Sequence, residues 1–310
     1  MNTPARLAAV ALGLGAVFAA AVGVGRVVGP VDAPAATSGS TPPAAPASGT
    51  GAADGGPAVL ASGYVLDPLE DRLPSGTASF AFRVLGPDGA PVVDYDVEQV
   101  EDLHLVTARR DLTGYQRLHP ELGPDGVWRV PLELTPGSWR VVADLTPSAL
   151  GQNLTLGTDV EVAGAYDPQP LPEPAAVAEV DGYSVALTGE LLVGQESELT
   201  FSVSRDGRPV SDLQPYLGGY GILVALRAGD LAYLHPHPAE PPAGTTPTAG
   251  PHKTFVATAP SPGTYRLFLD FRHGDAVHTA AFTVGVAGSG GDGSGGPTPD
   301  APPADHGHGD

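Results

Sequence analysis

The sequence contains no cysteine and only one methionine, Met1. The missing cysteine excludes disulfide bonds, thiolate metal ligands, cysteine nucleophiles and the cysteine ligand of a blue-copper centre. The missing internal methionine excludes a Met-rich Cu(I) site. Any metal that this chain binds therefore has nitrogen or oxygen ligands.

Basic residues are also scarce, with 15 Lys and Arg against 35 Asp and Glu, and the net charge is −20. Nucleic acids and anionic lipid surfaces need clustered positive charge, so neither is an expected partner. The sequence has no Gly-x-Ser-x-Gly elbow, no P-loop and no His-Glu-x-x-His motif. We therefore expect a protein that is not an enzyme.

The N-terminal region has one long uncharged run, Leu7 to Gly25, between Arg6 and Arg26. A helix over residues 7–25 would roughly match the ~30 Å hydrocarbon core of a bilayer. This favours an uncleaved membrane anchor, with residues 1–6 in the cytoplasm, over a cleaved signal peptide. The expected location is the cell membrane, single-pass with the bulk of the chain outside the cytoplasm. Cleavage would instead give a secreted protein.

Three further segments have the composition of linkers. Residues 27–58 are rich in Pro, Ala, Gly and Ser, and predict a disordered linker. Residues 288–310 predict a disordered tail. The stretch 165–177 holds four prolines and predicts a hinge.

The remaining sequence is a tandem repeat, which we call repeat 1 (62–163) and repeat 2 (181–286). Ser62-Gly63-Tyr64 aligns with Asp181-Gly182-Tyr183, and the Tyr115 motif YQRLHP aligns with the Tyr233 motif YLHPHP. The element PGSWR at 136–140 aligns with PGTYR at 262–266. A unit of about 100 residues is the size of a domain. We expect two like domains, 59–164 and 178–287.

The apolar residues alternate with period 2, as in Trp139, Val141 and Ala143, which indicates strands rather than helices. We expect all-β structure: two tandem immunoglobulin-like or cupredoxin-like β-sandwiches, after an N-terminal hydrophobic helix. Trp139 and Tyr265 are interpreted as core residues, and Asp111 and Asp230 as turn residues. The expected strands of repeat 1 lie near 63–68, 78–84, 91–97, 102–109, 127–134, 138–145 and 156–163.

Histidines are the candidate functional residues. His235 and His237 are two residues apart, so an extended segment would place both imidazoles on one face, and Pro236 and Pro238 confine that segment to a sheet edge or a loop. His273 and His278 flank a hairpin-like turn and are possible further ligands of Cu(II) or Zn(II). In repeat 1, Arg117 stands at the position of His235. Weaker candidate ligands are His104, His119, His252, His306 and His308.

These motifs resemble a family of exported, membrane-anchored proteins of high-GC Gram-positive bacteria that carry tandem immunoglobulin-like domains, akin to YtkA-like modules. The resemblance covers roughly residues 62–286, and YLHPHP and PG-x-YR are its most specific elements. It implies heavy-metal binding through the histidines. Histidines often stand in that family where Arg117 and Ile222 stand here, which weakens the implication for repeat 1.

Two functions follow as hypotheses. The first is an extracytoplasmic, membrane-anchored protein that binds a divalent transition metal through the histidines of repeat 2. The alternative is a non-catalytic structural or protein-interaction module of the cell envelope, whose partner is another envelope protein. The segment 239–253, which is longer than its counterpart after His119, is its candidate contact.

Overall fold

The computed structural model describes residues 60–97, 101–234, 236–239 and 249–288. The expected N-terminal helix, the linker 27–58 and nearly all of the tail lie outside these residues, as do His235, His306 and His308. In the described ranges, no helix is long and apolar enough to cross a bilayer. The described residues are all-β, as predicted, and belong to one compact unit, 51–310.

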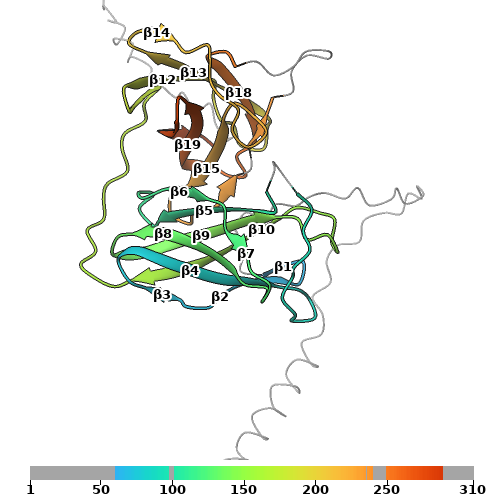
Figure 1. The fold of residues 1–310 in the computed structure, drawn as a ribbon. Helices are drawn as coiled ribbons and strands as arrows, with labels where there is room; N and C mark the ends of the chain where they lie inside the picture. The colour runs from blue at the N-terminus through green and yellow to red at the C-terminus, as the bar shows by residue number, and fades with distance from the viewer. Residues whose placement is uncertain (1–59, 98–100, 235, 240–248, 289–310) are drawn as a thin grey trace, which may run out of the picture. The chain divides into compact units, whose positions relative to one another are not determined.

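The first sandwich consists of two sheets formed by β1 to β10 (Figure 1). One sheet has the order β1-β2-β4-β8-β7 and the other β3-β10-β9-β5-β6. The strands are β1 (Leu60–Ala61), β2 (Tyr64–Pro68), β3 (Arg72–Leu73), β4 (Gly76–Leu85), β5 (Leu103–Arg109), β6 (Gln116–Leu118), β7 (Glu121–Leu122), β8 (Trp128–Leu134), β9 (Gly137–Leu145) and β10 (Leu154–Val162).

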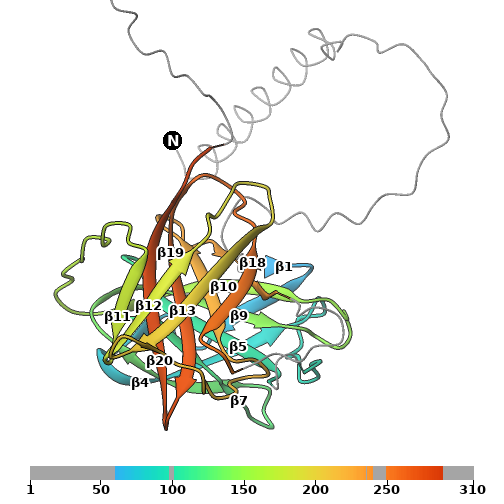
Figure 2. The same ribbon diagram turned by 90° about the horizontal axis from the view of Figure 1, so that it is seen from above.

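The second sandwich repeats this plan with β11 to β20. One sheet has the order β11-β12-β13-β18-β17, with β14 also paired to β13, and the other β16-β15-β19-β20. Figure 2 shows β12, β13 and β18 side by side. The strands are β11 (Val177–Val180), β12 (Tyr183–Thr188), β13 (Ser197–Arg205), β14 (Arg208–Pro209), β15 (Ile222–Arg227), β16 (Tyr233–Leu234), β17 (His237–Pro238), β18 (His252–Ala257), β19 (Gly263–His273) and β20 (Ala276–Val286).

The strand orders of the two sandwiches correspond to each other. The order β2-β4-β8-β7 matches β12-β13-β18-β17, and β6-β5-β9-β10 matches β16-β15-β19-β20. With strands lettered along the chain, these are the ABED and CFG arrangements of an immunoglobulin-like sandwich. The duplication seen in the sequence is therefore a duplication of topology as well.

Each sandwich has its own apolar core between its sheets. In β4, Ala78, Phe80, Phe82 and Val84 are buried while their neighbours in the strand are not, which confirms the period-2 pattern. Trp139 and Tyr265 are buried core residues, as predicted. Each also closes a matching corner: Trp139 Nε1 donates to the Thr135 carbonyl and the Tyr265 hydroxyl to the Ser261 carbonyl, both over 2.8 Å.

The expected strand at 91–97 is wrong. This segment makes only isolated bridges, Leu85 to Pro91 and Tyr95 to Pro147. The segment crosses between the sheets: Val92 N–H donates to the Val84 carbonyl of β4, and four residues later Asp96 N–H donates to the Thr146 carbonyl just beyond β9 in the other sheet, so neither ladder extends into a strand. The Tyr95 ring packs edge-on against Trp128 instead, with centroids 5.3 Å apart, and seals the side of the core.

Candidate functional site

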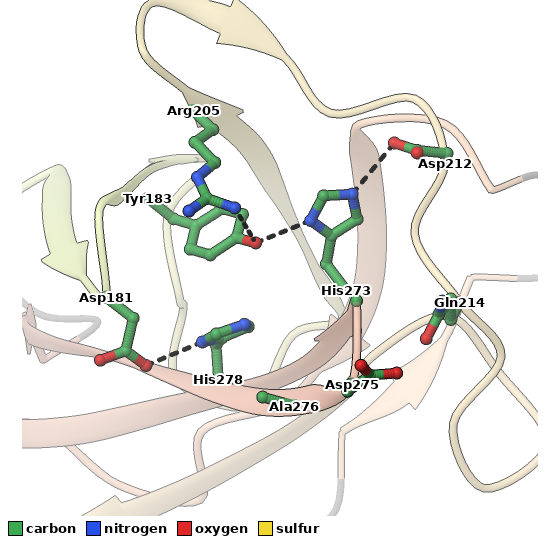
Figure 3. A pocket seen from close by; sticks show the side chains of 10 residues that line it. Asp181, Tyr183, Arg205, Asp212, Gln214, His273, Asp275, Ala276 and His278 are labelled. Carbon is green, nitrogen blue, oxygen red and sulfur yellow. Dashed lines mark hydrogen bonds and ion pairs between the residues drawn. The ribbon is translucent and has the colours of Figure 1, made fainter.

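A polar pocket of about 390 Å³ lies at one end of the second sandwich (Figure 3). Three two-residue hairpin loops adjoin it, at 181–182, 206–207 and 274–275. In the first two loops both residues have positive φ, as in a type I′ turn, and both loops have the Asp-Gly sequence that this turn favours. We call this site the hairpin-end pocket. It is lined by Asp181, Tyr183, Arg205, Asp212, Gln214, His273, Gly274, Asp275, Ala276 and His278.

His273, the last residue of β19, is held at both ring nitrogens. Its Nδ1 lies 2.7 Å from the Tyr183 hydroxyl and its Nε2 lies 3.1 Å from Asp212 Oδ1. Arg205 Nη1 donates to the same hydroxyl over 3.1 Å, and its guanidinium lies 4.9 Å from the Tyr183 ring centroid. The four side chains thus form one chain, from Arg205 through Tyr183 and His273 to Asp212.

His278, in β20, is held by a different carboxylate. Its Nδ1 lies 2.7 Å from Asp181 Oδ2, and its ring packs against Tyr183 with centroids 4.6 Å apart. Because Asp181 accepts at Nδ1, the Nε2 of His278 is available for a second role. Tyr183 lies between both histidines and joins them into one site (Figure 3).

The electrostatic character of the pocket is mainly acidic. Asp181, Asp212 and Asp275 line it, with Arg205 as the basic residue. Asp181 and Asp212 are largely exposed, at 62% and 81% of their side-chain surface, so their contacts with the histidines are screened by solvent. A pocket of this kind favours a cationic ligand over an anionic one.

The structure brings together two of the four main predicted ligands. His273 and His278 share the hairpin-end pocket, whereas His237 lies in β17, the edge strand of the other sheet, opposite Val256. His237-Pro238 at a sheet edge agrees with the prediction from its flanking prolines. Within the part of the chain that the structure describes, no three His, Asp or Glu side chains stand close enough to hold one metal ion.

The weaker candidates lie elsewhere. His252, in β18, is exposed and its Nδ1 lies 2.8 Å from the Ser202 hydroxyl. In repeat 1, buried His104 accepts a hydrogen bond at Nδ1 from Arg117 over 3.1 Å, and the His104 and His119 rings pack edge to face with centroids 5.9 Å apart. Burial, and then the positive charge of Arg117, lower the pKa of His119. Arg117, which replaces a histidine of the motif, therefore favours a neutral imidazole at His119.

The four pocket residues that contact the two histidines or continue their hydrogen bonds were not predicted as site residues from the sequence: Tyr183, Arg205, Asp181 and Asp212. The signal for two of them was the aligned Asp181-Gly182-Tyr183, where the Asp-Gly pair indicates a tight hairpin. Repeat 1 keeps the tyrosine as Tyr64 but has no equivalent histidines. The alignment of Tyr265 with Trp139 and the strand register place Pro147 and Leu154 at the positions of His273 and His278.

Comparison with known families gives one match. A family model described as "Domain of unknown function (DUF8832)" matches residues 178–288, about one third of the chain. The matched segment is repeat 2, including the hairpin-end pocket. No curated protein matches the sequence.

Several solved structures are distantly similar. Domains 4 and 5 of the S-layer protein SbsC share 12% identity, over 68% of this chain and 82% of that chain, with a TM-score of 0.22. The fibronectin(III)-like modules of Clostridium thermocellum CbhA share 12% identity, over 72% of this chain and 92% of that chain, with a TM-score of 0.20. A mutant Salmonella alpha-2-macroglobulin shares 13% identity over 74% of this chain, with a TM-score of 0.26, and the match spans only 15% of that protein. No functional conclusion follows from likenesses at this level.

Proposed function

We propose that this chain is a non-catalytic extracytoplasmic protein, anchored by its N-terminal segment, that binds a divalent transition metal, Cu(II) or Zn(II), in the hairpin-end pocket. The observation that carries the proposal is the convergence of His273 and His278 on one pocket. Each has one ring nitrogen held by a carboxylate. The all-nitrogen-and-oxygen ligand set agrees with a chain that lacks cysteine.

The hydrogen bonds suggest which atoms would ligate the ion. Asp181 at Nδ1 fixes the His278 tautomer whose Nε2 carries the lone pair, an arrangement common among metal-bound histidines. At His273, Nε2 and Asp212 Oδ1 are 3.1 Å apart, a separation suited to two ligands that each lie about 2.0–2.2 Å from one ion. His273 and Asp212 are therefore the first pair of ligands, and His278 joins by a local movement of the hairpin.

Replacing the His273–Asp212 contact by two bonds to a metal ion costs little stability, because Asp212 is largely exposed and its contact with His273 is screened by solvent. His273 can ligate through Nε2 only when that nitrogen carries no proton, so the proton of the neutral ring must lie on Nδ1, and solvent protons compete with the metal for the ring. Affinity is therefore expected to fall in mildly acidic buffer.

The test is isothermal titration of Cu(II) and Zn(II) into residues 59–288, which lack His306 and His308. The expected result is a one-site isotherm that is lost in the double variant His273→Ala with His278→Ala. His252→Ala is the matched control, because His252 is an exposed histidine of the same repeat outside the pocket. An isotherm that survives the double variant unchanged would contradict the assignment of the site.

The second candidate is a structural or protein-interaction module of the cell envelope. The observation that favours it is that both ring nitrogens of His273 are already engaged within the protein, so that His273 serves to hold the end of the sandwich together. No heat with either metal would support this candidate. Deletion of residues 240–248 is then expected to remove capture of an envelope partner in a pull-down, with unchanged thermal unfolding.

A further inference from the structure

A third apolar cluster lies outside the two sandwich cores and joins repeat 1 to repeat 2. Its eight buried residues come equally from both repeats and occupy four aligned pairs of positions. In repeat 1 the four residues lie in β5, in β9 and in the turn after β5. In repeat 2 they lie in β15, in β19 and in the turn after β15. The pairs are Val106 with Val224, Ala108 with Leu226, Leu112 with Leu231, and Val142 with Phe268. We call the four residues of each repeat its pairing face.

The hydrogen bonds across this cluster are reciprocal. The Tyr115 hydroxyl donates to Asp270 Oδ2 over 3.0 Å, and the Tyr233 hydroxyl donates to Asp144 Oδ2 over 3.4 Å. Tyr115 aligns with Tyr233 and Asp144 aligns with Asp270. Each repeat therefore both gives and accepts the same bond, which is the signature of a two-fold, self-complementary interface.

The leucine of each pairing face is presented by a matching turn. Leu112 and Leu231 both have positive φ, at 63° and 56°. A preceding aspartate pairs with the arginine that ends the strand, Arg109 with Asp111 at 2.6 Å and Arg227 with Asp230. The carboxylates also accept the backbone N–H two residues on, as expected of turn residues. The same turn in both repeats therefore places a leucine in the cluster between them.

The two faces differ in size at two of the four positions. Repeat 1 carries the small residues Ala108 and Val142 where repeat 2 carries Leu226 and Phe268. The Phe268 ring stacks on Tyr115 of repeat 1 with centroids 4.0 Å apart, in the same cluster as Ala108 and Val142. Two repeat 2 faces would be overpacked against each other and two repeat 1 faces would leave a cavity. The sizes therefore select the pairing of repeat 1 with repeat 2.

We propose that these faces also dock between chains, so that repeat 1 of one copy binds repeat 2 of a second copy. The eight buried residues of the cluster and both reciprocal hydrogen bonds belong to the two repeats, and of the connecting segment only Leu171 packs against the cluster. Two chains that exchange repeats form a closed dimer with two such interfaces, and exchange of identical elements needs no new contacts.

The test uses two variants of the full chain, each with one disabled face. Leu112→Asp disables the repeat 1 face and Leu231→Asp the repeat 2 face. Aspartate tolerates positive φ, and neither leucine belongs to a sandwich core, so each sandwich is expected to fold. Circular dichroism checks this, and Ala108→Arg and Val224→Asp are replacement variants for the two faces if a leucine variant unfolds.

The expected result is that each variant alone is monomeric by light scattering, and that the mixture at about 100 μM forms a 1:1 complex of twice the mass. Leu112→Met mixed with Leu231→Met is the control, which should remain monomeric because each chain satisfies its own faces. A mixture of the aspartate variants that stays monomeric overturns docking between chains. Equal dimerisation of each aspartate variant alone overturns the selection by size.

Discussion

The two repeats share one framework and differ at its hairpin end. Both have the same strand orders, the same corner hydrogen bond at Trp139 or Tyr265, and a pairing face at the same positions. Only repeat 2 surrounds its buried tyrosine with His273 and His278. The difference separates the two roles of the duplicated sequence: aligned residues build the sandwich and its pairing, and residues found in one copy mark the binding site.

The pairing faces offer the largest test of this comparison. Phe268→Ala is expected to lower the free energy of unfolding by about 3–5 kcal/mol, because it removes a buried ring that stacks on Tyr115. The equivalent change Val142→Ala removes only two methyl groups and should cost clearly less. Urea unfolding of the two variants measures the difference. Equal losses would show that the larger residue of the repeat 2 face contributes no more to the free energy of unfolding than the smaller one of repeat 1.

The arginine–aspartate turns are expected to differ in acid sensitivity. Burial raises the pKa of Asp111, but hydrogen bonds from Arg109, Gln169 and Thr113 together outweigh it and hold the pKa well below its usual range. For Asp230 the hydrogen bond from Arg227 is the main cause of a lowered pKa. Because both pKa values are lowered on folding, the stability they contribute is complete above about pH 3.9 and is lost as the pH falls below it.

Asp111→Asn is therefore expected to cost about 1.5–3 kcal/mol at neutral pH, and the difference from the unchanged chain should shrink below about pH 4. Asp230→Asn should cost less, because the Asp230 side chain is 41% exposed whereas that of Asp111 is 7% exposed. Chemical denaturation between pH 3 and pH 7 measures both. A loss for Asp111→Asn that does not change with pH would exclude the ion pair as its cause.

Two aligned glycines test the surroundings of the corner. Gly137 and Gly263 both have positive φ, at 134° and 142°, so both resist replacement by alanine. A Cβ on Gly137 would lie 2.7 Å from Tyr166 Cδ2, whereas one on Gly263 would come no closer than 3.9 Å to Arg227 Cδ. Gly137→Ala should therefore lower the free energy of unfolding by about 1–2 kcal/mol more than Gly263→Ala, as measured by thermal unfolding. Relative to Tyr166→Ala alone, Gly137→Ala should then lose most of that excess, with the contact to Arg109 Cδ at 3.2 Å left.

The smallest expected effect concerns the tyrosine of the hairpin end. Tyr183→Phe removes the hydrogen bonds to His273 and from Arg205 and should cost about 0.5–1.5 kcal/mol. Tyr64→Phe is the matched change in repeat 1, where Pro147 and Leu154 replace the two histidines, and should cost less. Differential scanning calorimetry of the pair checks this. A larger loss at Tyr64 would contradict the structural role of Tyr183 in its pocket.

Much of the fold follows from local sequence. Alternation of apolar residues predicts β4, β8 and β9, and the repeated PG-x-aromatic-Arg element predicts the corner at Trp139 and Tyr265. The segment 91–97 has the same alternation, but its backbone bonds run first to Val84 in one sheet and then to Thr146 beside the other, so it forms no strand. Local pattern therefore predicts strands well except where a segment crosses from one sheet to the other.

The candidate site was less predictable, because its contacts join distant parts of the chain. Tyr183 reaches His273 across 90 residues and Asp181 reaches His278 across 97. The histidines stand out by residue type alone, but the tyrosine, the arginine and the two aspartates that hold them resemble ordinary hairpin residues. Metal binding at His273 and His278 remains a prediction for titration.

Leu112 and Leu231 place a narrow limit on which residues their turns accept. Each position requires an apolar side chain for the partner repeat and a left-handed backbone in the same residue. Valine and isoleucine meet the first requirement but are strained in the second, and glycine and asparagine meet only the second. Saturation mutagenesis of either position should therefore tolerate few residues besides leucine and methionine, although neither lies in a sandwich core. The most substitution-sensitive sites outside the sandwich cores are therefore expected at two turns, one in each sandwich.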